Sequence, residues 1–191
     1  MKGVKIGLTG PLASGKGEVS KYLKLRGFKY ISLSDMVREE LKKRRLEETR
    51  DNLMMIGNSL RKEEGAGVFG KRVKEKIENG NKELNWVIDG IRNPAEIEEL
   101  RKMEKFFLLA VAAPKETLIE RVKNRKRRSD PLSEEQIEKK LMREWGIDEP
   151  PDGQQVGACM GEADFFVMND ASLEELHNFL DSLLSAIEKN I

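Results

Sequence analysis

The stretch VKIGLTGPLASGKGEV, residues 4–19, places a glycine-rich turn between a short apolar run and an amphipathic segment. The run Val4–Thr9 predicts a buried strand, and the pattern of Gly15–Leu25 predicts a helix. A tight turn from a buried strand into a helix N-terminus attracts anions, because the first N–H groups of the helix have no partner within the helix. The stretch therefore predicts an anion site inside an α/β fold.

The residues of the turn make that site a phosphate-binding loop. Gly10 and Gly15 let the backbone bend with its N–H groups pointing inward, and Lys16 can reach the β- and γ-phosphates of a nucleotide. The pattern G-x-x-x-x-G-K-[ST] is matched except at Gly17, which stands where a hydroxyl is usual. We predict that ATP is bound by Gly10, Pro11, Leu12, Ala13, Ser14, Gly15, Lys16, Gly17 and Glu18.

Composition is compatible with one domain. The 191 residues suffice for a sizeable core, and positive and negative charges cancel to a net +1, which favours neither a nucleic-acid protein nor a membrane-surface protein. A single cysteine, Cys159, excludes an internal disulfide and suits a reducing compartment, and we expect its thiol to be structural. Without a leader or an apolar run of roughly 18 residues, the sequence predicts a cytoplasmic protein.

Short apolar runs alternate with amphipathic segments along the chain. FFLLAVAA, residues 106–113, is almost wholly apolar, which favours strands of a parallel sheet covered by helices on both faces. Capping-box patterns begin helices at Asn93, Ser133 and Ser172. The predicted strands are Val4–Thr9, Phe28–Ser32, Asn85–Asp89, Phe106–Ala112 and Asp164–Met168.

Two excursions interrupt this alternation. Residues 34–84 predict several helices and no strand, and residues 121–161 are basic, then helical, then a Pro/Gly loop. With no linker between them, we expect one domain, residues 1–191, whose core comprises residues 1–33, 85–120 and 162–191. The core is predicted to include Met36, Met54 and Met55 in the first excursion, and the stripe Leu173, Leu176, Leu180, Leu183 and Ile187 of the last helix.

Lys16-Gly17 after the loop resembles the adenylate- and cytidylate-kinase branch of P-loop phosphotransferases, whose loops read G-x-x-G-x-G-K-G. Glu18 departs from that pattern, in which Thr is common. The resemblance implies a three-layer α/β/α P-loop NTPase fold, a parallel five-stranded sheet ordered 2-3-1-4-5, a helical acceptor-binding insert (residues 34–84) and a short basic lid (residues 121–161). It also implies ATP with Mg²⁺ as donor and a nucleoside or deoxynucleoside monophosphate as acceptor.

The first acceptor residues follow from the same resemblance. YISLSDMVREELKK, residues 30–43, is similar to the segment that begins the acceptor lobe of adenylate kinases, which places Asp35 and Arg38 at the acceptor. A guanidinium fork suits a phosphate, although Arg38 could also be one charge on an amphipathic helix. Gly57, Arg61 and Gly65 resemble a pattern of deoxynucleoside monophosphate kinases, and Arg61 is a third acceptor candidate; an ordinary solvated helix explains it equally well.

NWVIDGIRNP, residues 85–94, ends an apolar strand in a carboxylate. Asp89 resembles the carboxylate that orients Mg²⁺ through water. Gly90 and Arg92 resemble the family's D-G-[FY]-P-R, with the arginine one residue early, and are predicted to bind the acceptor at the carboxyl edge of the sheet. The alternative is a strand end and helix cap with an incidental arginine.

The basic run RVKNRKRR, residues 121–128, admits three interpretations. A nucleic-acid patch lacks interleaved aromatic residues, and a solvated helix face would need balancing Glu. A lid supplies cations around the moving phosphoryl group, and an R-x-x-x-R pair similar to the adenylate-kinase lid points to Arg121 and Arg125. Further lid candidates are Arg127, Arg128 and Arg143, and Asn169 occupies the place of a loop that contacts the donor adenine.

These features predict direct transfer of the γ-phosphoryl group, with Lys16, Arg92, Arg121 and Arg125 as catalytic residues and Asp89 at the metal. A dephospho-coenzyme A kinase, with Asp35 as base, is one alternative. A nucleotide-switched ATPase that binds RNA is another, although the balanced charge does not favour a nucleic-acid partner. The oligomeric state is left open between monomer and dimer.

Overall fold

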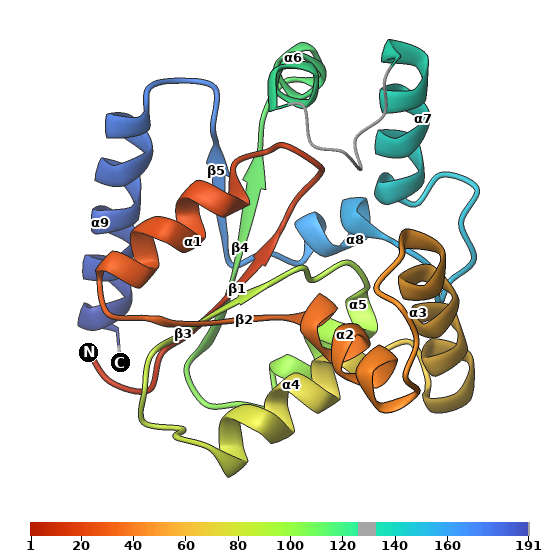
Figure 1. Ribbon diagram of the computed structural model, residues 1–191. Coiled ribbons are helices and arrows are strands. Elements are labelled where there is room, and N and C mark those ends of the chain that lie inside the picture. The colour runs from red at the N-terminus through yellow and green to blue at the C-terminus, as the bar shows by residue number, and fades with distance from the viewer. Residues whose placement is uncertain (126–132, 191) are drawn as a thin grey trace.

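The computed structural model of the protein describes residues 1–125 and 133–190. Its centre is a parallel sheet with the order β2-β3-β1-β4-β5, which confirms the predicted order (Figure 1). Strand β4 has the predicted bounds, and each of the other four strands begins one residue later than predicted. The strands are β1 (Lys5–Thr9), β2 (Lys29–Ser32), β3 (Trp86–Asp89), β4 (Phe106–Ala112) and β5 (Phe165–Met168).

The register brings the carboxyl ends of the strands to one edge. Ser32 at the end of β2 pairs with Asp89 at the end of β3, and Ala112 at the end of β4 pairs with Met168. The phosphate loop leaves this same edge after Thr9. Residues that follow different strands therefore meet at this edge although they are far apart in the sequence, and Asn169 after β5 contacts Ser14 after β1.

Helices join the strands, and their starts follow the sequence. Capping boxes at Asn93, Ser133 and Ser172 are all present, and Ser32 with Asp35 forms a further one. The helices are α1 (Lys16–Leu25), α2 (Leu33–Lys43), α3 (Arg50–Glu64), α4 (Val68–Asn79), α5 (Pro94–Leu100), α6 (Lys115–Arg125), α7 (Glu134–Trp145), α8 (Val156–Gly161) and α9 (Leu173–Lys189).

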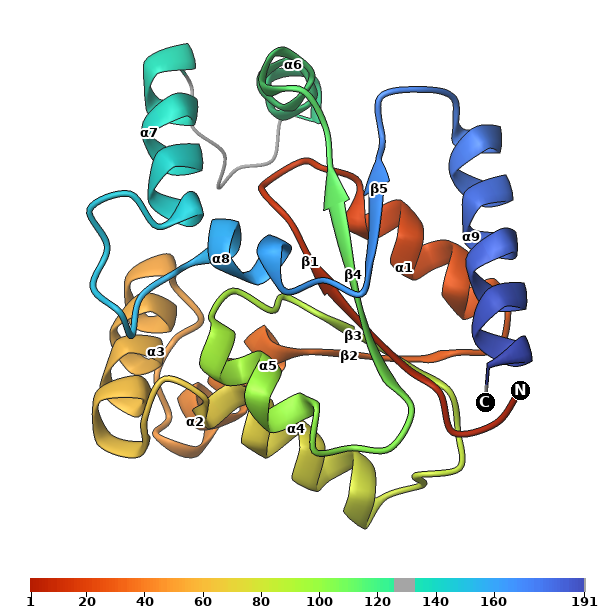
Figure 2. The same ribbon diagram turned by 180° about the vertical axis from the view of Figure 1, so that it is seen from behind.

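The two faces of the sheet carry separate apolar cores. α1 and α9 cover one face, packing Leu23 and Leu180 against Leu8, and α2, α4, α5 and α8 lie on the other (Figures 1 and 2). Gly7 faces the second core, where a Cβ would lie 2.7 Å from the Ile91 side chain. The result is the three-layer α/β/α arrangement that the alternation of strands and helices predicted.

Three predicted core residues prove to be exposed. Met54 and Met55 are 45% and 52% exposed because α3 turns Ile56 and Leu60, one turn apart, toward the core. Leu173, 51% exposed, is the first residue of α9 and lies beyond the stripe that docks on the sheet. The other predicted residues of that stripe, and Met36, are buried as expected.

Cys159 is fully buried in α8, and burial raises the pKa of its thiol to about 12, which suits the structural role predicted for it. Within residues 1–125 and 133–190, every helix falls short of the length and apolarity that a bilayer crossing demands.

Candidate active site

The phosphate loop has the backbone shape that its glycines predict. Gly10 and Gly15 have φ angles of 138° and 110°, in a region that other residues rarely adopt. A Cβ on Gly15 would lie 2.0 Å from Nδ2 of Asn169, which donates a hydrogen bond of 2.8 Å to the Ser14 carbonyl oxygen. Asn169, predicted to lie near the adenine, therefore holds the loop from the end of β5.

Lys16 turns back along the loop. Its Nζ donates hydrogen bonds to the carbonyl oxygens of Gly10 (2.6 Å) and Pro11 (2.9 Å). Burial of the ammonium lowers its pKa to about 8, while Asp89 and Glu144 act in the opposite direction. The amine is thus held over the loop by carbonyl groups and lies near two carboxylates.

Gly17 has open space on its side-chain side, with no atom within 4 Å of an added Cβ. The backbone would therefore accommodate a side chain at position 17, and its geometry does not require a glycine there. Ser14 carries a hydroxyl inside the loop, and its Oγ is buried without a hydrogen-bond partner among the described residues. Glu18, at the departure from the adenylate-kinase pattern, is exposed on the first turn of α1.

Asp89 fits the role of a magnesium carboxylate. Its Oδ2 accepts a hydrogen bond of 3.2 Å from the Tyr30 hydroxyl, while its Oδ1 is buried and finds no partner in the part of the chain that the structure describes. A buried oxygen without a donor is available to a hydrated cation. Within the described ranges no three Asp, Glu, His or Cys side chains gather as a metal site, so the phosphates and water would complete the coordination.

A cavity of about 520 Å³ adjoins the loop at Leu12. Its walls come from the insert, from the segment after β3 and from the lid region, so the cavity lies where the sequence predicted an acceptor. Predicted residues on its wall are Arg38, Arg61, Gly90, Arg92 and Arg143. Apolar residues of the wall include Leu33, Val37, Leu53, Met54 and Phe69, and the lid region also contributes Lys140, Glu144, Glu149, Gly153 and Gln154.

Two of the cavity arginines are held by residues of the lid region. Arg92 donates to Gln154 (2.9 Å) and has Glu144 at 3.8 Å, and Arg143 donates to Glu149 (2.7 Å). Charge on this side of the cavity is therefore balanced by carboxylates that an anionic ligand could replace.

Arg38 is paired on the insert side, with Asp35 (3.0 Å) and Glu48 (2.8 Å). The other oxygen of Asp35 accepts the Ser32 N–H at 3.1 Å and so caps α2. Asp35 is absent from the cavity wall formed by the described residues, and its role at the acceptor stays a prediction.

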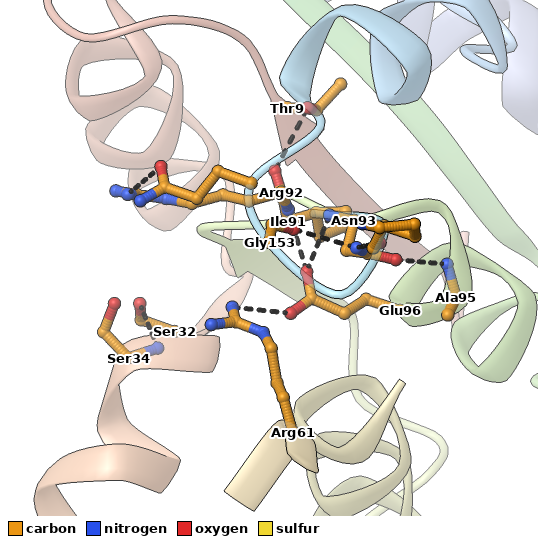
Figure 3. A network of polar contacts seen from close by, with 12 residues as sticks. Thr9, Ser32, Ser34, Arg61, Ile91, Arg92, Asn93, Ala95, Glu96 and Gly153 are labelled. Carbon is orange, nitrogen blue, oxygen red and sulfur yellow. Dashed lines mark hydrogen bonds and ion pairs between the residues drawn. The ribbon is translucent and has the colours of Figure 1, made fainter. Parts of the chain in front are cut away.

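A fully buried carboxylate, Glu96, lines the cavity. It accepts hydrogen bonds from the backbone N–H groups of Arg92 (2.8 Å) and Asn93 (3.2 Å), and Figure 3 shows Arg61 approaching it from α3. Burial raises the pKa of Glu96, and Arg61, 3.4 Å away, opposes this. Arg61 also stacks on Phe69, 4.8 Å from its ring centre, and its Nε is buried without a described partner.

The lid region packs against the loop. Ile119 and Val122 of α6 and Ile137 of α7 form a small core that contacts Leu12 and Ala13. Arg121, on α6, has a buried Nη1 that makes no hydrogen bond within residues 1–125 and 133–190.

Two other lid predictions differ in how far the structure describes them. Arg125 lies close enough to lower the pKa of Lys16. The candidates Arg127 and Arg128 lie outside the described residues.

Glu144 is a site residue that the sequence did not reveal. This buried carboxylate on α7 accepts the backbone N–H of Leu12 at 2.8 Å. The available signal was its spacing: Ile137, Leu141 and Glu144 follow one face of the helix, so Glu144 continues an apolar stripe.

A parallel sheet in this order, with a lysine-bearing phosphate loop after its central strand and a cavity beside the loop, defines a P-loop kinase-like protein. The sequence profile of a family described as AAA domain matches residues 6–143. A UPF0200 protein of Sulfurisphaera tokodaii is 36% identical over 182 residues, covering 95% of this chain and 96% of the relative. The chain therefore belongs to the UPF0200 family and contains an AAA domain.

A UPF0200/UPF0201 protein of Archaeoglobus fulgidus is 35% identical over 191 residues, which are 97% of this chain. The chain spans 56% of that relative's length.

Solved structures agree with the fold. TT1252 from Thermus thermophilus has a TM-score of 0.59 at 21% identity, covering 96% of this chain and 97% of its own. A shikimate kinase from Acinetobacter baumannii, in complex with shikimate, has a TM-score of 0.57 at 16% identity, covering 96% and 93%. The P-loop kinase-like fold is thus confirmed, while the adenylate- and cytidylate-kinase branch stays a prediction.

Proposed function

We propose that the protein is an ATP-dependent phosphotransferase that transfers the γ-phosphoryl group to a nucleotide-type acceptor. The observation that carries this proposal is the direct contact between the phosphate loop and the cavity, at Leu12. A phosphoryl group bound beside Lys16 would face the acceptor without crossing solvent, which direct transfer needs. Because ATP is the donor, we expect the enzyme to work in the cytoplasm.

The donor site is built from the loop. N–H groups of the loop and of the first turn of α1 would hold the phosphates, and Lys16 would leave the carbonyl groups of Gly10 and Pro11 to follow the γ-phosphoryl group. Arg121 and Arg125 would neutralise charge from the lid side. Asp89 would hold hydrated Mg²⁺, which when bound neutralises charge on the β- and γ-phosphates.

Support for an anionic acceptor comes from the cavity. Arg38, Arg92 and Arg143 line it, and each is paired with a carboxylate that a phosphate group could replace. The apolar wall, which includes Val37 and Leu53, suits the face of a base. A nucleoside or deoxynucleoside monophosphate, attacking through its phosphate, is the first candidate.

A second candidate acceptor is a nucleotide that attacks through a hydroxyl, as in a dephospho-coenzyme A kinase. The observation that favours it is the buried carboxylate of Glu144 between the loop and the cavity. A hydroxyl must lose a proton during the transfer, whereas a phosphate oxygen is already ionised.

A coupled assay of ADP release tests the proposed function. Wild-type protein with ATP and Mg²⁺ is offered each nucleoside and deoxynucleoside monophosphate and dephospho-coenzyme A. We expect one acceptor class to raise ADP release and Lys16→Ala to lower the stimulated rate by roughly 100-fold or more. Bound ATP with slow hydrolysis and no response to any acceptor would instead favour the nucleotide-switched ATPase, whose RNA affinity would fall steeply with salt.

A further inference from the structure

Glu144 is held against the phosphate loop by several groups. Its side chain is 7% exposed, Oε2 accepts the Leu12 N–H at 2.8 Å, and Oε1 lies 3.8 Å from Nη1 of Arg92. A buried carboxylate is costly unless hydrogen bonds and cations compensate it. Here the chain supplies an amide and two cations, Arg92 and the ammonium of Lys16, whose pKa responds to Glu144.

Glu144 lies where the phosphate loop meets the acceptor cavity. Lys16 Nζ contacts the carbonyl groups of Gly10 and Pro11, so the amine that attends the γ-phosphoryl group lies beside the first half of the loop. Leu12 is the next residue, and both Leu12 and Glu144 line the acceptor cavity. The carboxylate therefore lies between the phosphate loop and the cavity.

We propose that Glu144 is a catalytic base that takes the proton from an acceptor hydroxyl, so that, of the two candidate acceptor classes, the substrate is the one that attacks through a hydroxyl, an anionic alcohol. The inference rests on the proposed function. As the hydroxyl oxygen forms its bond to the γ-phosphorus, the bond from that phosphorus to the β–γ bridging oxygen breaks and ADP leaves with the electron pair. The hydroxyl proton passes to the Glu144 carboxylate and is released to solvent after the phosphate ester departs.

The surroundings favour a hydroxyl for two reasons. An attacking phosphate is itself anionic and has no proton to transfer, so a carboxylate beside its path would repel it. Asp35, the base that the sequence offered, has one oxygen on Arg38 and the other on the Ser32 N–H. Among the residues that the structure describes, Glu144 is the carboxylate that both accepts a loop N–H and lines the cavity, while Arg38 and Arg92 can bind a charged group elsewhere on the alcohol.

The first test uses ATP and Mg²⁺ without an added acceptor, so that water takes the acceptor's place. Glu144→Gln preserves an oxygen for the Leu12 N–H but cannot take a proton. We expect its hydrolysis rate to fall about 100-fold, within the usual range for loss of a general base, with ATP affinity changed less than about threefold. Glu144→Asp should recover part of the rate. Glu135→Gln, the same change at an exposed position of α7, is the matched control and should behave as wild type.

The second test identifies the product of the wild-type enzyme and needs no variant. After incubation with ATP and either dephospho-coenzyme A or each nucleoside monophosphate, ³¹P NMR distinguishes a phosphate monoester from a phosphoanhydride. A monoester together with a slow Glu144→Gln variant supports the inference. An anhydride product, or a Glu144→Gln variant as fast as wild type, would overturn it while leaving the proposed function standing. A wild-type protein that binds no ATP would refute the proposed function itself.

Discussion

The lowered pKa of Lys16 predicts that nucleotide affinity falls in mildly alkaline solution. The ammonium is desolvated over the loop, and its pKa is about 8 instead of the ordinary 10.5. ATP binds the charged form, because a neutral amine offers no charge to the phosphates. The perturbation is a pH change from 7.5 to 9 in the free protein, which removes the proton from Lys16.

The size of the effect follows from the pKa. With a value of about 8, roughly three-quarters of the Lys16 side chains are charged at pH 7.5 and about one-tenth at pH 9, so the Kd for ATP should rise about eightfold. Binding at pH 9 should also take up close to one proton per nucleotide. Cys159 and Tyr30 do not titrate in this range, because burial raises both pKa values to about 12.

Isothermal titration calorimetry in two buffers with different ionisation enthalpies measures both the Kd and the proton uptake. Lys16→Arg is the control, because its guanidinium stays charged and its affinity should not change over this pH range. A wild-type Kd that is constant between pH 7.5 and 9, without proton uptake, would show that Lys16 is not the phosphate ligand or that its ammonium is not desolvated.

Three further substitutions probe the surroundings. Gly15→Ala should weaken ATP binding at least tenfold in a titration while the protein stays folded, because the added Cβ would lie 2.0 Å from Nδ2 of Asn169 and φ is 110°. Unchanged affinity would argue that the loop does not bind the nucleotide. Tyr30→Phe removes the hydroxyl that donates a hydrogen bond to Oδ2 of Asp89, so the carboxylate is oriented less firmly, and we expect kcat to fall several-fold at unchanged ATP affinity. A change in Kd without a change in kcat would contradict this. Glu96→Ala should destabilise the protein by about 3 kcal/mol in urea unfolding, since it leaves a guanidinium and two amides unpaired; a loss under 1 kcal/mol would contradict the structural role.

Much of the fold could be predicted because local patterns specify it. Near-continuous apolar runs such as Phe106–Ala112 predict buried strands, and the capping residues mark where helices begin. The exposed positions of Met54 and Met55 could not be read from residue type, because composition does not say which side of α3 meets the core. Position on the helix decided their burial, and Ile56 with Leu60 defines the buried side.

The site was predictable only in part. The loop is contiguous in sequence, so its pattern was visible, as was the carboxylate at the end of β3. The contact between Glu144 and Leu12 joins residues separated by 132 positions and appears only when α7 packs on the loop. Likewise, the sequence pattern was interpreted as an acceptor residue at Asp35, and the capping of α2 by Asp35, three residues after Ser32, was not foreseen. Its role at the acceptor stays a prediction.

The central claim, that the loop holds the triphosphate and delivers it toward the cavity, is tested most directly by a crystal structure with a non-hydrolysable ATP analogue and Mg²⁺. We predict the β- and γ-phosphates on the N–H groups of residues 13–17, with Lys16 Nζ moved from the Gly10 and Pro11 carbonyl oxygens to the γ-phosphate. A nucleotide bound elsewhere, or a loop whose lysine keeps both carbonyl contacts at saturating analogue, would contradict the account.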